Sequence, residues 1–163
     1  PLPDKHTQAI RALVERRDEL VRFKSAEKTR FRSPGASKPL KQSIKRSISF
    51  LEKEIASIDQ QLEEEVDKSE DFKRRLEIIT SIPSIGKVLG TCILATMPEL
   101  GTIDNRVAAA LSGTAPYNHD SGKMKGKRAT GGGRVRVRCA LYVAALVACR
   151  RNKPLAQFYQ QLR

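Results

Sequence analysis

The chain has 163 residues, enough for one ordinary domain or for a small domain with an extension. Apolar residues make up 39% of it, but aromatic residues are few and Trp is absent, so any core must rest on Leu, Ile, Val and Ala, which suits packed helices better than a β-sandwich. The net charge of +13 indicates a polyanionic partner, and no apolar run is long enough for a membrane-spanning segment.

The first predicted element is a helix over residues 4–31. This stretch lacks Gly and Pro, and its apolar residues recur at helical spacing. They form one stripe, made of Ile10, Leu13, Val14, Leu20 and Val21. The sequence RSPGASKP over residues 32–39 is typical of a loop, so we expect the helix to end there.

A second, longer helix is predicted over residues 40–76, and it carries a regular apolar seam. The seam residues follow one another at steps of 4, 3, 4, 3 and 4: Ile44, Ile48, Leu51, Ile55, Ile58 and Leu62. Such a period, about 3.5 residues, indicates a coiled coil. Its partner is either the first helix folded back antiparallel or a helix of another subunit, and an ordinary long bundle helix is the alternative. We predict a coiled-coil helical hairpin over residues 1–77 and a homo-oligomer formed through it.

Beyond Leu76 the predicted helices become shorter, because Gly and Pro are frequent. One helix is expected over residues 85–97. Another should begin at Asp104, whose side chain can cap the first turn, and reach Leu111. Gly113 should stop it, since glycine readily adopts the left-handed backbone conformation that ends helices.

The remainder of the chain is predicted to be a long ordered loop followed by two helices. The loop, over residues 114–133, is rich in glycine, and the first helix covers residues 134–151. That helix should carry five apolar residues on one face: Val137, Leu141, Ala144, Ala145 and Ala148. Residues 152–154 break it before a short terminal helix. The predicted fold class is therefore all-α, with a compact helical domain over residues 78–163 after the hairpin.

Residues 81–90, with the sequence SIPSIGKVLG, join two predicted helices and resemble the hairpin of helix-hairpin-helix DNA-binding modules. Gly86 matches the second hairpin glycine, which lets the backbone approach a phosphate, and Ser84 stands where the first glycine is usual. We therefore predict that Gly86 and Lys87 bind nucleic acid. Gly90 supplies the small residue that close helix packing needs, and the alternative is an ordinary turn between helices.

The strongest charge signal lies at the C-terminal end. Between Ser121 and Arg163 there are eleven Lys or Arg residues and no Asp or Glu, which indicates a surface that binds a polyanion. Glycines free backbone amides for phosphate oxygens, and arginines offer forked donors. The residues of this region that we predict to bind nucleic acid are Lys123, Lys125, Lys127, Arg128, Arg134, Arg136 and Arg138.

No metal site is predicted within the chain. The three cysteines, Cys92, Cys139 and Cys149, are far apart and surrounded by apolar residues, and no CxxC pair or Cys/His cluster occurs. The two histidines, His6 and His119, are isolated as well. We expect the cysteines to be reduced residues of the core.

Several short motifs occur in a fixed order over residues 78–163. They are Ile82-Pro83-Ser84-Ile85-Gly86, Met97-Pro98-Glu99-Leu100-Gly101, Leu111-Ser112-Gly113-Thr114-Ala115-Pro116-Tyr117, Asp120-Ser121-Gly122, Gly131-Gly132-Gly133-Arg134, Arg138 with Leu141-Tyr142, and Asn152-Lys153-Pro154-Leu155 with Phe158-Tyr159. In this order they resemble the C-terminal domain of the DEDD-type, bridge-RNA-guided insertion-sequence transposases related to Piv-type DNA invertases. A coiled coil precedes this domain in that family too.

The resemblance implies that Ser121 is the recombination nucleophile, whose hydroxyl attacks a DNA phosphodiester and forms a transient phosphoserine bond. We infer that Arg128, Arg134 and Arg138 neutralise charge on the five-coordinate phosphorus. Family members also carry a RuvC-like domain with four acidic ligands for Mg²⁺. No βαβ pattern is seen here and the chain starts at Pro1, so we expect a C-terminal portion that is inactive alone, holds no cofactor and needs Mg²⁺ bound by the absent domain.

Two other interpretations stay open. The alternative is a non-catalytic helix-hairpin-helix DNA-binding module with a dimerising coiled coil, which would need its basic residues but not the Ser121 hydroxyl. RNA binding is compatible with the transposase interpretation, since the acid-free loop suits a structured guide RNA as well as DNA. The expected partners are therefore DNA and a guide RNA, with no membrane, in the cytoplasm of a prokaryote near the nucleoid.

Overall fold

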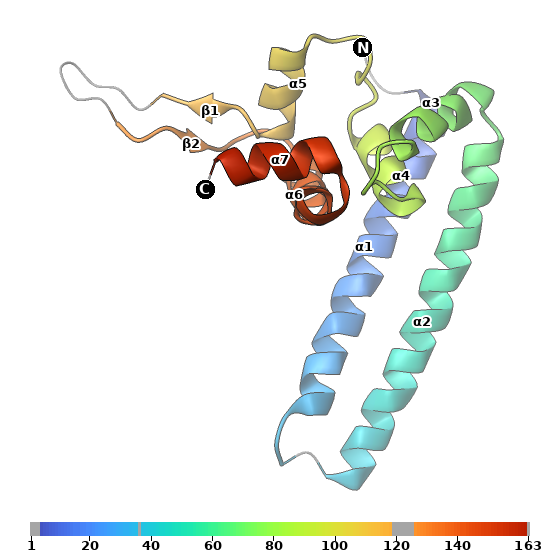
Figure 1. Ribbon diagram of the computed structural model, residues 1–163. Coiled ribbons are helices and arrows are strands. Elements are labelled where there is room, and N and C mark those ends of the chain that lie inside the picture. Colours follow the sequence, from blue (N-terminus) through green and yellow to red (C-terminus); the bar gives the residue numbers. More distant parts are fainter. Residues whose placement is uncertain (1–3, 36, 119–125, 163) are drawn as a thin grey trace. The chain divides into compact units, whose positions relative to one another are not determined.

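The computed structural model describes residues 4–35, 37–118 and 126–162, which form seven helices and one two-stranded antiparallel sheet (Figure 1). The elements in chain order are α1 (Lys5–Arg32), α2 (Lys38–Asp67), α3 (Glu70–Thr80), α4 (Lys87–Thr96), α5 (Asn105–Ser112), β1 (Pro116–Tyr117), β2 (Ala129–Thr130), α6 (Val135–Arg151) and α7 (Lys153–Gln161). The predicted all-α fold class is confirmed. The chain divides into two compact units, with the boundary between Lys73 and Arg74.

Helices α1 and α2 of the first unit form an antiparallel pair within one chain (Figure 1). The His6 ring nitrogen Nε2 lies 2.6 Å from the Glu65 carbonyl oxygen, and Arg17 Nε donates to Asp59 Oδ1 at 2.5 Å. Further along, Lys28 lies 3.7 Å from Glu52. The partner's number falls as the number along α1 rises, so the two helices run in opposite directions. The first helix therefore supplies the partner for the seam of α2, and a homo-oligomer through this seam stays a prediction.

The seam on α2 is buried unevenly. Ile44, Ile55 and Leu62 are buried, whereas Ile48, Leu51 and Ile58 are half-buried. On α1 the buried apolar residues are Ile10, Val14 and Leu20. No residue of α1 after Leu20 is a buried apolar residue. Most of the buried apolar contact therefore lies between the first part of α1 and the last part of α2, away from the connecting turn.

The prediction of one continuous helix over residues 40–76 is wrong, because the helix is interrupted between α2 and α3. Lys68 and Ser69 separate the two helices. The Ser69 hydroxyl accepts a hydrogen bond from the Phe72 amide at 3.3 Å, as an N-cap does, and Glu70 and Asp71 follow in the first turn. A capping serine and two acids at the positive end of the helix dipole favour a new helix start over continuation.

In the second unit, α4 is the central helix. Every residue from Gly90 to Met97 is buried. A Cβ atom on Gly90 would lie 2.8 Å from Leu76 Cδ1 and 3.0 Å from Ile79 Cγ2, so the small residue lets α3 pack closely on α4, as the sequence predicted. Helix α6 also contacts α4.

Helix α6 buries part of its apolar face. Its buried residues are Val137, Ala144 and Ala148, whereas Ala145 is exposed. The prediction that the cysteines belong to the core is wrong for Cys139, which is exposed, while Cys92 is buried. Helix α7 folds back on α6 and contacts it. No residue of α7 is buried, so this helix packs at the surface of the unit.

The predicted caps of α5 are confirmed. The Asp104 carboxylate accepts hydrogen bonds from the amides of Arg106 and Val107, at 2.7 and 2.9 Å, and Gly113 ends the helix with a φ of +70°. The loop predicted after it is wrong in part, because its two ends pair as β1 and β2. Pro116 lies opposite Thr130, and Tyr117 lies opposite Ala129.

Candidate nucleic-acid interface

The predicted basic loop leaves and rejoins the second unit through the β1–β2 pair. Ser121, Lys123 and Lys125 lie outside the described residues. Lys127 and Arg128 are described and exposed, directly before β2. Pairing of the two strands brings the ends of the loop together, so these two cations lie at the base of the segment that contains Ser121.

Below the strands, the backbone of Gly113 meets the backbone of Gly133. A Cβ atom on Gly133 would lie 2.7 Å from Gly113 Cα and 2.7 Å from the Leu111 carbonyl oxygen, which leaves no room for a side chain. Gly113, Gly132 and Gly133 all have positive φ values, of +70°, +63° and +60°. Only glycine adopts this region without strain. Both the backbone conformation and the close contact therefore explain why glycines stand here.

This junction is held by hydrogen bonds from the start of α6. The Arg134 amide donates to the Leu111 carbonyl oxygen at 2.7 Å. The Arg138 guanidinium donates through Nη1 to the Gly132 carbonyl oxygen at 2.6 Å. Both bonds tie the glycine run to fixed helices, so the position where the loop starts and ends is set by α5 and α6.

Arg134 makes a forked ion pair with Glu99. Its Nη1 and Nη2 atoms donate to the two carboxylate oxygens at 2.7 and 2.8 Å, and Nη1 also donates to the Thr96 carbonyl oxygen at 2.8 Å. The hydrogen bonds from Arg134 are the main reason why the pKa of Glu99 falls from its ordinary value of 4.5 to about 2. The same bonds raise the pKa of Arg134. This pair joins the end of α4 to the start of α6.

We expect the stability of the protein to depend on pH through Glu99. Its pKa is lower in the folded chain than in the unfolded chain, so the pair stabilises the fold above pH 4.5, and this contribution is lost as the pH falls from 4.5 towards 2. Because a third of each side chain is exposed, the loss should be about 1 kcal/mol. Denaturant titrations of the wild type and Glu99→Gln would measure it. Equal pH dependence of the two proteins would contradict the assignment.

The other predicted residues of α6 and α4 lie apart from the strand pair. Arg136 is half-buried in the first turn of α6. Gly86 precedes α4 as its N-cap residue and Lys87 is the first helical residue, and both are exposed. Because Arg134 contacts Thr96 at the other end of α4, the ten-residue length of this helix puts the two places about 15 Å apart.

The turn before α4 has one unusual backbone angle. Ser84, which stands where the first glycine of a helix-hairpin-helix turn is usual, has a φ of +99°, a region that favours glycine. The Gly86 backbone is extended, with a φ of −89° and ample space around its Cα. The turn therefore has the backbone shape that a glycine at position 84 would give, while its contact with nucleic acid stays a prediction.

Two residues that position the interface were not identified from the sequence. Glu99 neutralises Arg134, and Arg75 donates to the carbonyl oxygens of Pro98 and Leu100 at 2.7 and 2.9 Å. The sequence signal that could have identified Glu99 is the small number of acids, since the second unit contains only four Asp or Glu residues in its 90 residues. An acid in so basic a unit is expected to pair with a specific Lys or Arg side chain.

The arrangement combines a fixed frame with an exposed basic loop. Arg134 and Arg138 donate hydrogen bonds to groups of the frame, and Lys127 and Arg128 are exposed directly before β2. Forked and point-like cations of this kind bind phosphate oxygens. Chemically, the interface can hold a phosphate backbone next to the segment that contains the Ser121 hydroxyl.

Most of the second unit is similar to a known protein family. Residues 76–160 match the family model described as Transposase IS116/IS110/IS902 family. No curated protein matches the chain significantly. Within the part of the chain that the structure describes, none of the helices combines the length and the apolar character that crossing a membrane requires.

Proposed function

Because the chain belongs to the IS116/IS110/IS902 transposase family, whose model covers more than half of it, we propose that it binds DNA through the basic loop and supplies Ser121 as the nucleophile of strand exchange. The family membership supports a role in transposition. The observation that supports this site is the glycine junction, which holds both ends of the Ser121 segment against α5 and α6.

DNA binding is supported by charge. The second unit has fifteen Lys or Arg residues against four Asp or Glu, and the acids are absent from Ser121 onward. Lys127 and Arg128 are exposed at the base of the loop, where they can bind phosphates of the DNA backbone. Backbone contacts of this kind position a protein on DNA without reading its sequence.

The proposed chemistry is a phosphoryl transfer. The Ser121 oxygen forms a bond to the phosphorus, the ester bond to one deoxyribose oxygen breaks, and that oxygen leaves as a hydroxyl after taking the serine proton. A hydroxyl of the exchanged strand then attacks the phosphoserine, which restores the DNA ester and frees the serine. Cations next to the loop would stabilise the additional negative charge on the five-coordinate phosphorus.

A magnesium ion stays a prediction that rests on the family resemblance. Among the described residues, no three His, Cys, Asp or Glu side chains come together as ligands. Glu99, the acid that contacts the start of α6, is already engaged by Arg134. The described residues therefore do not fit a metal site, and no step of the proposal involves one. A guide RNA and a homo-oligomer are likewise parts of the proposal.

The DNA-binding part of the proposal predicts a change in salt dependence. Replacing Lys127 and Arg128 with Ala should weaken binding to all DNA sequences alike. It should also flatten the plot of log affinity against log salt by about 0.9 for each phosphate that is no longer neutralised, hence by nearly two units. Fluorescence anisotropy with a DNA duplex at several salt concentrations would measure the slope.

Exposed basic residues elsewhere in the second unit provide the control. Arg106 on α5 and Arg74 on α3 are also exposed, and replacing both with Ala removes the same net charge. If this control variant flattens the slope as much as the loop variant does, the loop is not the DNA-binding surface. In that case the turn at Gly86 and Lys87, as in the non-catalytic DNA-binding alternative, becomes the place to test.

A further inference from the structure

The first unit separates its charges along the helical hairpin. It contains 16 Lys or Arg and 14 Asp or Glu residues, so it is almost neutral as a whole. Between Leu20 and Leu51, however, nine basic residues face a single acid, Glu27. The nine are Arg22, Lys24, Lys28, Arg30, Arg32, Lys38, Lys41, Lys45 and Arg46. From Glu52 to Asp71 the balance is reversed, with nine acids and two lysines.

The nine basic residues gather at one end of the hairpin, which we call the basic tip. They occupy the last part of α1 and the first part of α2, on both sides of the turn that connects these antiparallel helices (Figure 1). Eight of them are exposed and Lys24 is half-buried. Lys38, Lys41 and Lys45 follow one another at steps of three and four residues, which puts them on one face of α2.

Few of these charges are neutralised within the chain. Glu27 pairs with Arg30 at 2.6 Å, and Lys28 lies 3.7 Å from Glu52. Over the described ranges, the other seven cations of the basic tip have no acidic side chain within 4.0 Å. Lys38 and Lys41 also stand in the first turn of α2, where the helix dipole is positive and no acid offsets them.

Such an arrangement opposes folding, since like charges repel one another and two of them oppose the helix dipole. On the rest of the same hairpin, exposed basic side chains form ion pairs with acids of the same helix, such as Arg11–Glu15 and Arg16–Glu19, as is usual for a solvent-exposed helix. A feature that lowers the stability of the free protein indicates a ligand that removes the repulsion when it binds. Here that ligand must be a polyanion.

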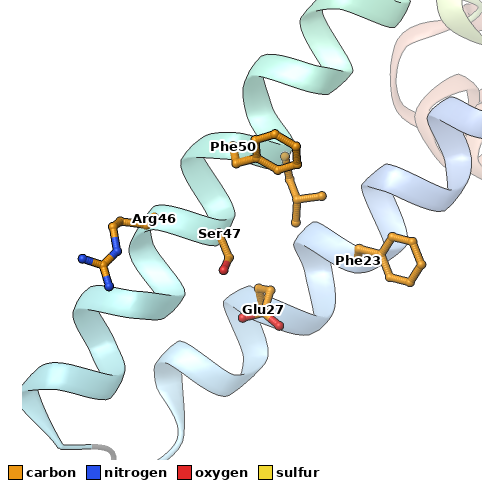
Figure 2. A pocket seen from close by; sticks show the side chains of 6 residues that line it. Phe23, Glu27, Arg46, Ser47 and Phe50 are labelled. Carbon is orange, nitrogen blue, oxygen red and sulfur yellow. The ribbon is translucent and has the colours of Figure 1, made fainter.

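The basic tip also exposes aromatic rings. Phe23 on α1 and Phe50 on α2 are 56% and 60% exposed, and both line a surface pocket of about 480 Å³ with Glu27, Arg46, Ser47 and Leu51. Figure 2 shows Arg46 pointing away from α1, on the outer side of α2, while Ser47 points from α2 toward α1. Aromatic rings beside cations are what proteins use to stack unpaired bases while they hold a nucleic-acid backbone.

We propose that the basic tip is a second nucleic-acid-binding surface, which holds phosphates with its lysines and arginines and stacks an unpaired base on Phe23 or Phe50. Serine hydroxyls interleaved with the cations, at Ser43, Ser47 and Ser49, add neutral donors of the kind that contact phosphates. This surface belongs to the first unit, outside residues 76–160, and is independent of the basic loop.

Two variants of the full chain with equal net charge test the proposal. The tip variant carries Lys38→Gln, Lys41→Gln, Lys45→Gln and Arg46→Gln. The matched control carries Lys5→Gln, Arg11→Gln, Arg16→Gln and Lys53→Gln, from the same two helices. The probes are a DNA duplex, an RNA duplex of the same sequence, each with and without an unpaired loop, and phosphatidylserine vesicles.

With at least one nucleic acid, the tip variant should flatten the salt slope by about 3 units more than the control does, since each neutralised phosphate contributes about 0.9. A probe with an unpaired loop should bind more tightly than its duplex, and Phe23→Ala with Phe50→Ala should abolish that difference. Equal slopes for the tip and control variants would overturn the proposal. A loss of binding confined to the vesicles would overturn it too, in favour of a lipid surface.

A crosslinking measurement keeps the test independent of folding defects and of the basic loop. Benzoylphenylalanine in place of Phe50 should crosslink to the bound nucleic acid, whereas the same group in place of the exposed Gln61 on α2 should not. The Phe50 crosslink should persist when Lys127 and Arg128 are replaced with Ala, so the two surfaces can fail separately. Absence of the crosslink at Phe50 under conditions of binding would refute the tip surface.

Discussion

Replacement of Ser121 with Ala should abolish strand exchange and leave DNA binding intact. The substitution removes one oxygen atom from a loop flanked by glycine, so the free energy of unfolding should change by no more than about 0.5 kcal/mol. In the proposed interface the surrounding cations and amides supply the affinity for DNA, so this affinity should hardly change. A covalent protein–DNA adduct, in contrast, cannot form without the hydroxyl. The readout is the adduct trapped on a denaturing gel with the complete transposase, its guide RNA and labelled donor DNA.

Two serines serve as controls for this experiment. Ser112 is buried at the end of α5, where its hydroxyl donates to the Ala109 carbonyl oxygen at 3.0 Å, and Ser84 lies in the turn before α4. Replacing either with Ala should leave the adduct detectable. If Ser121→Ala still forms the adduct, the nucleophile is another group, and Tyr117 at the base of the loop is the next hydroxyl to test. If neither the wild type nor Ser121→Ala forms an adduct, the non-catalytic DNA-binding alternative is favoured.

The glycine run before α6 should respond to alanine in a steep order. Gly131 has open space around it and no positive φ, so Gly131→Ala should be nearly neutral. Gly132 has a φ of +63° and no close neighbour, so its substitution should cost about 1 kcal/mol of backbone strain. At Gly133 the same strain is joined by contacts with the backbone of Gly113 and Leu111, and we expect a cost of at least about 3 kcal/mol.

Chemical denaturation of the three variants measures this order directly. Because the side chain added is the same in each case, differences between the variants report the backbone conformation and the space at each position. Gly133→Ala should also abolish strand exchange, since the Leu111–Arg134 hydrogen bond and the loop base must shift together. A Gly133→Ala variant as stable as Gly131→Ala would show that the two glycine backbones do not meet as described.

Regular patterns explain why much of the fold could be predicted. The apolar steps from Ile44 to Leu62 define the inward face of α2, and the Asp104 and Gly113 signals define both ends of α5, because caps depend on local geometry alone. The break at Ser69 escaped prediction for the opposite reason. Residues 40–76 contain no Gly or Pro to mark an interruption, and only the serine followed by Glu70 and Asp71 indicates that a new helix begins.

The site could be predicted only in part. The basic loop and its glycines are visible as composition, but the pairing of Arg134 with Glu99 joins residues 35 positions apart, and no local pattern specifies it. The sequence therefore assigns the arginine to phosphate, whereas in the fold its fork holds Glu99. The basic tip is equally hard to predict, since the charges of residues 20–51 become one surface only when α1 and α2 fold back on each other.

The contact between Gly113 and Gly133 has a consequence for how this protein can change. The 19 residues between them form a closed loop, whose ends are fixed by the backbone of two helices. The entropy of closing such a loop grows only with the logarithm of its length, so doubling it would cost about 0.6 kcal/mol. Insertions between the two strands, away from the glycines of the junction, should therefore hardly affect the helical frame, so selection can vary the length and charge of that connection independently of the fold.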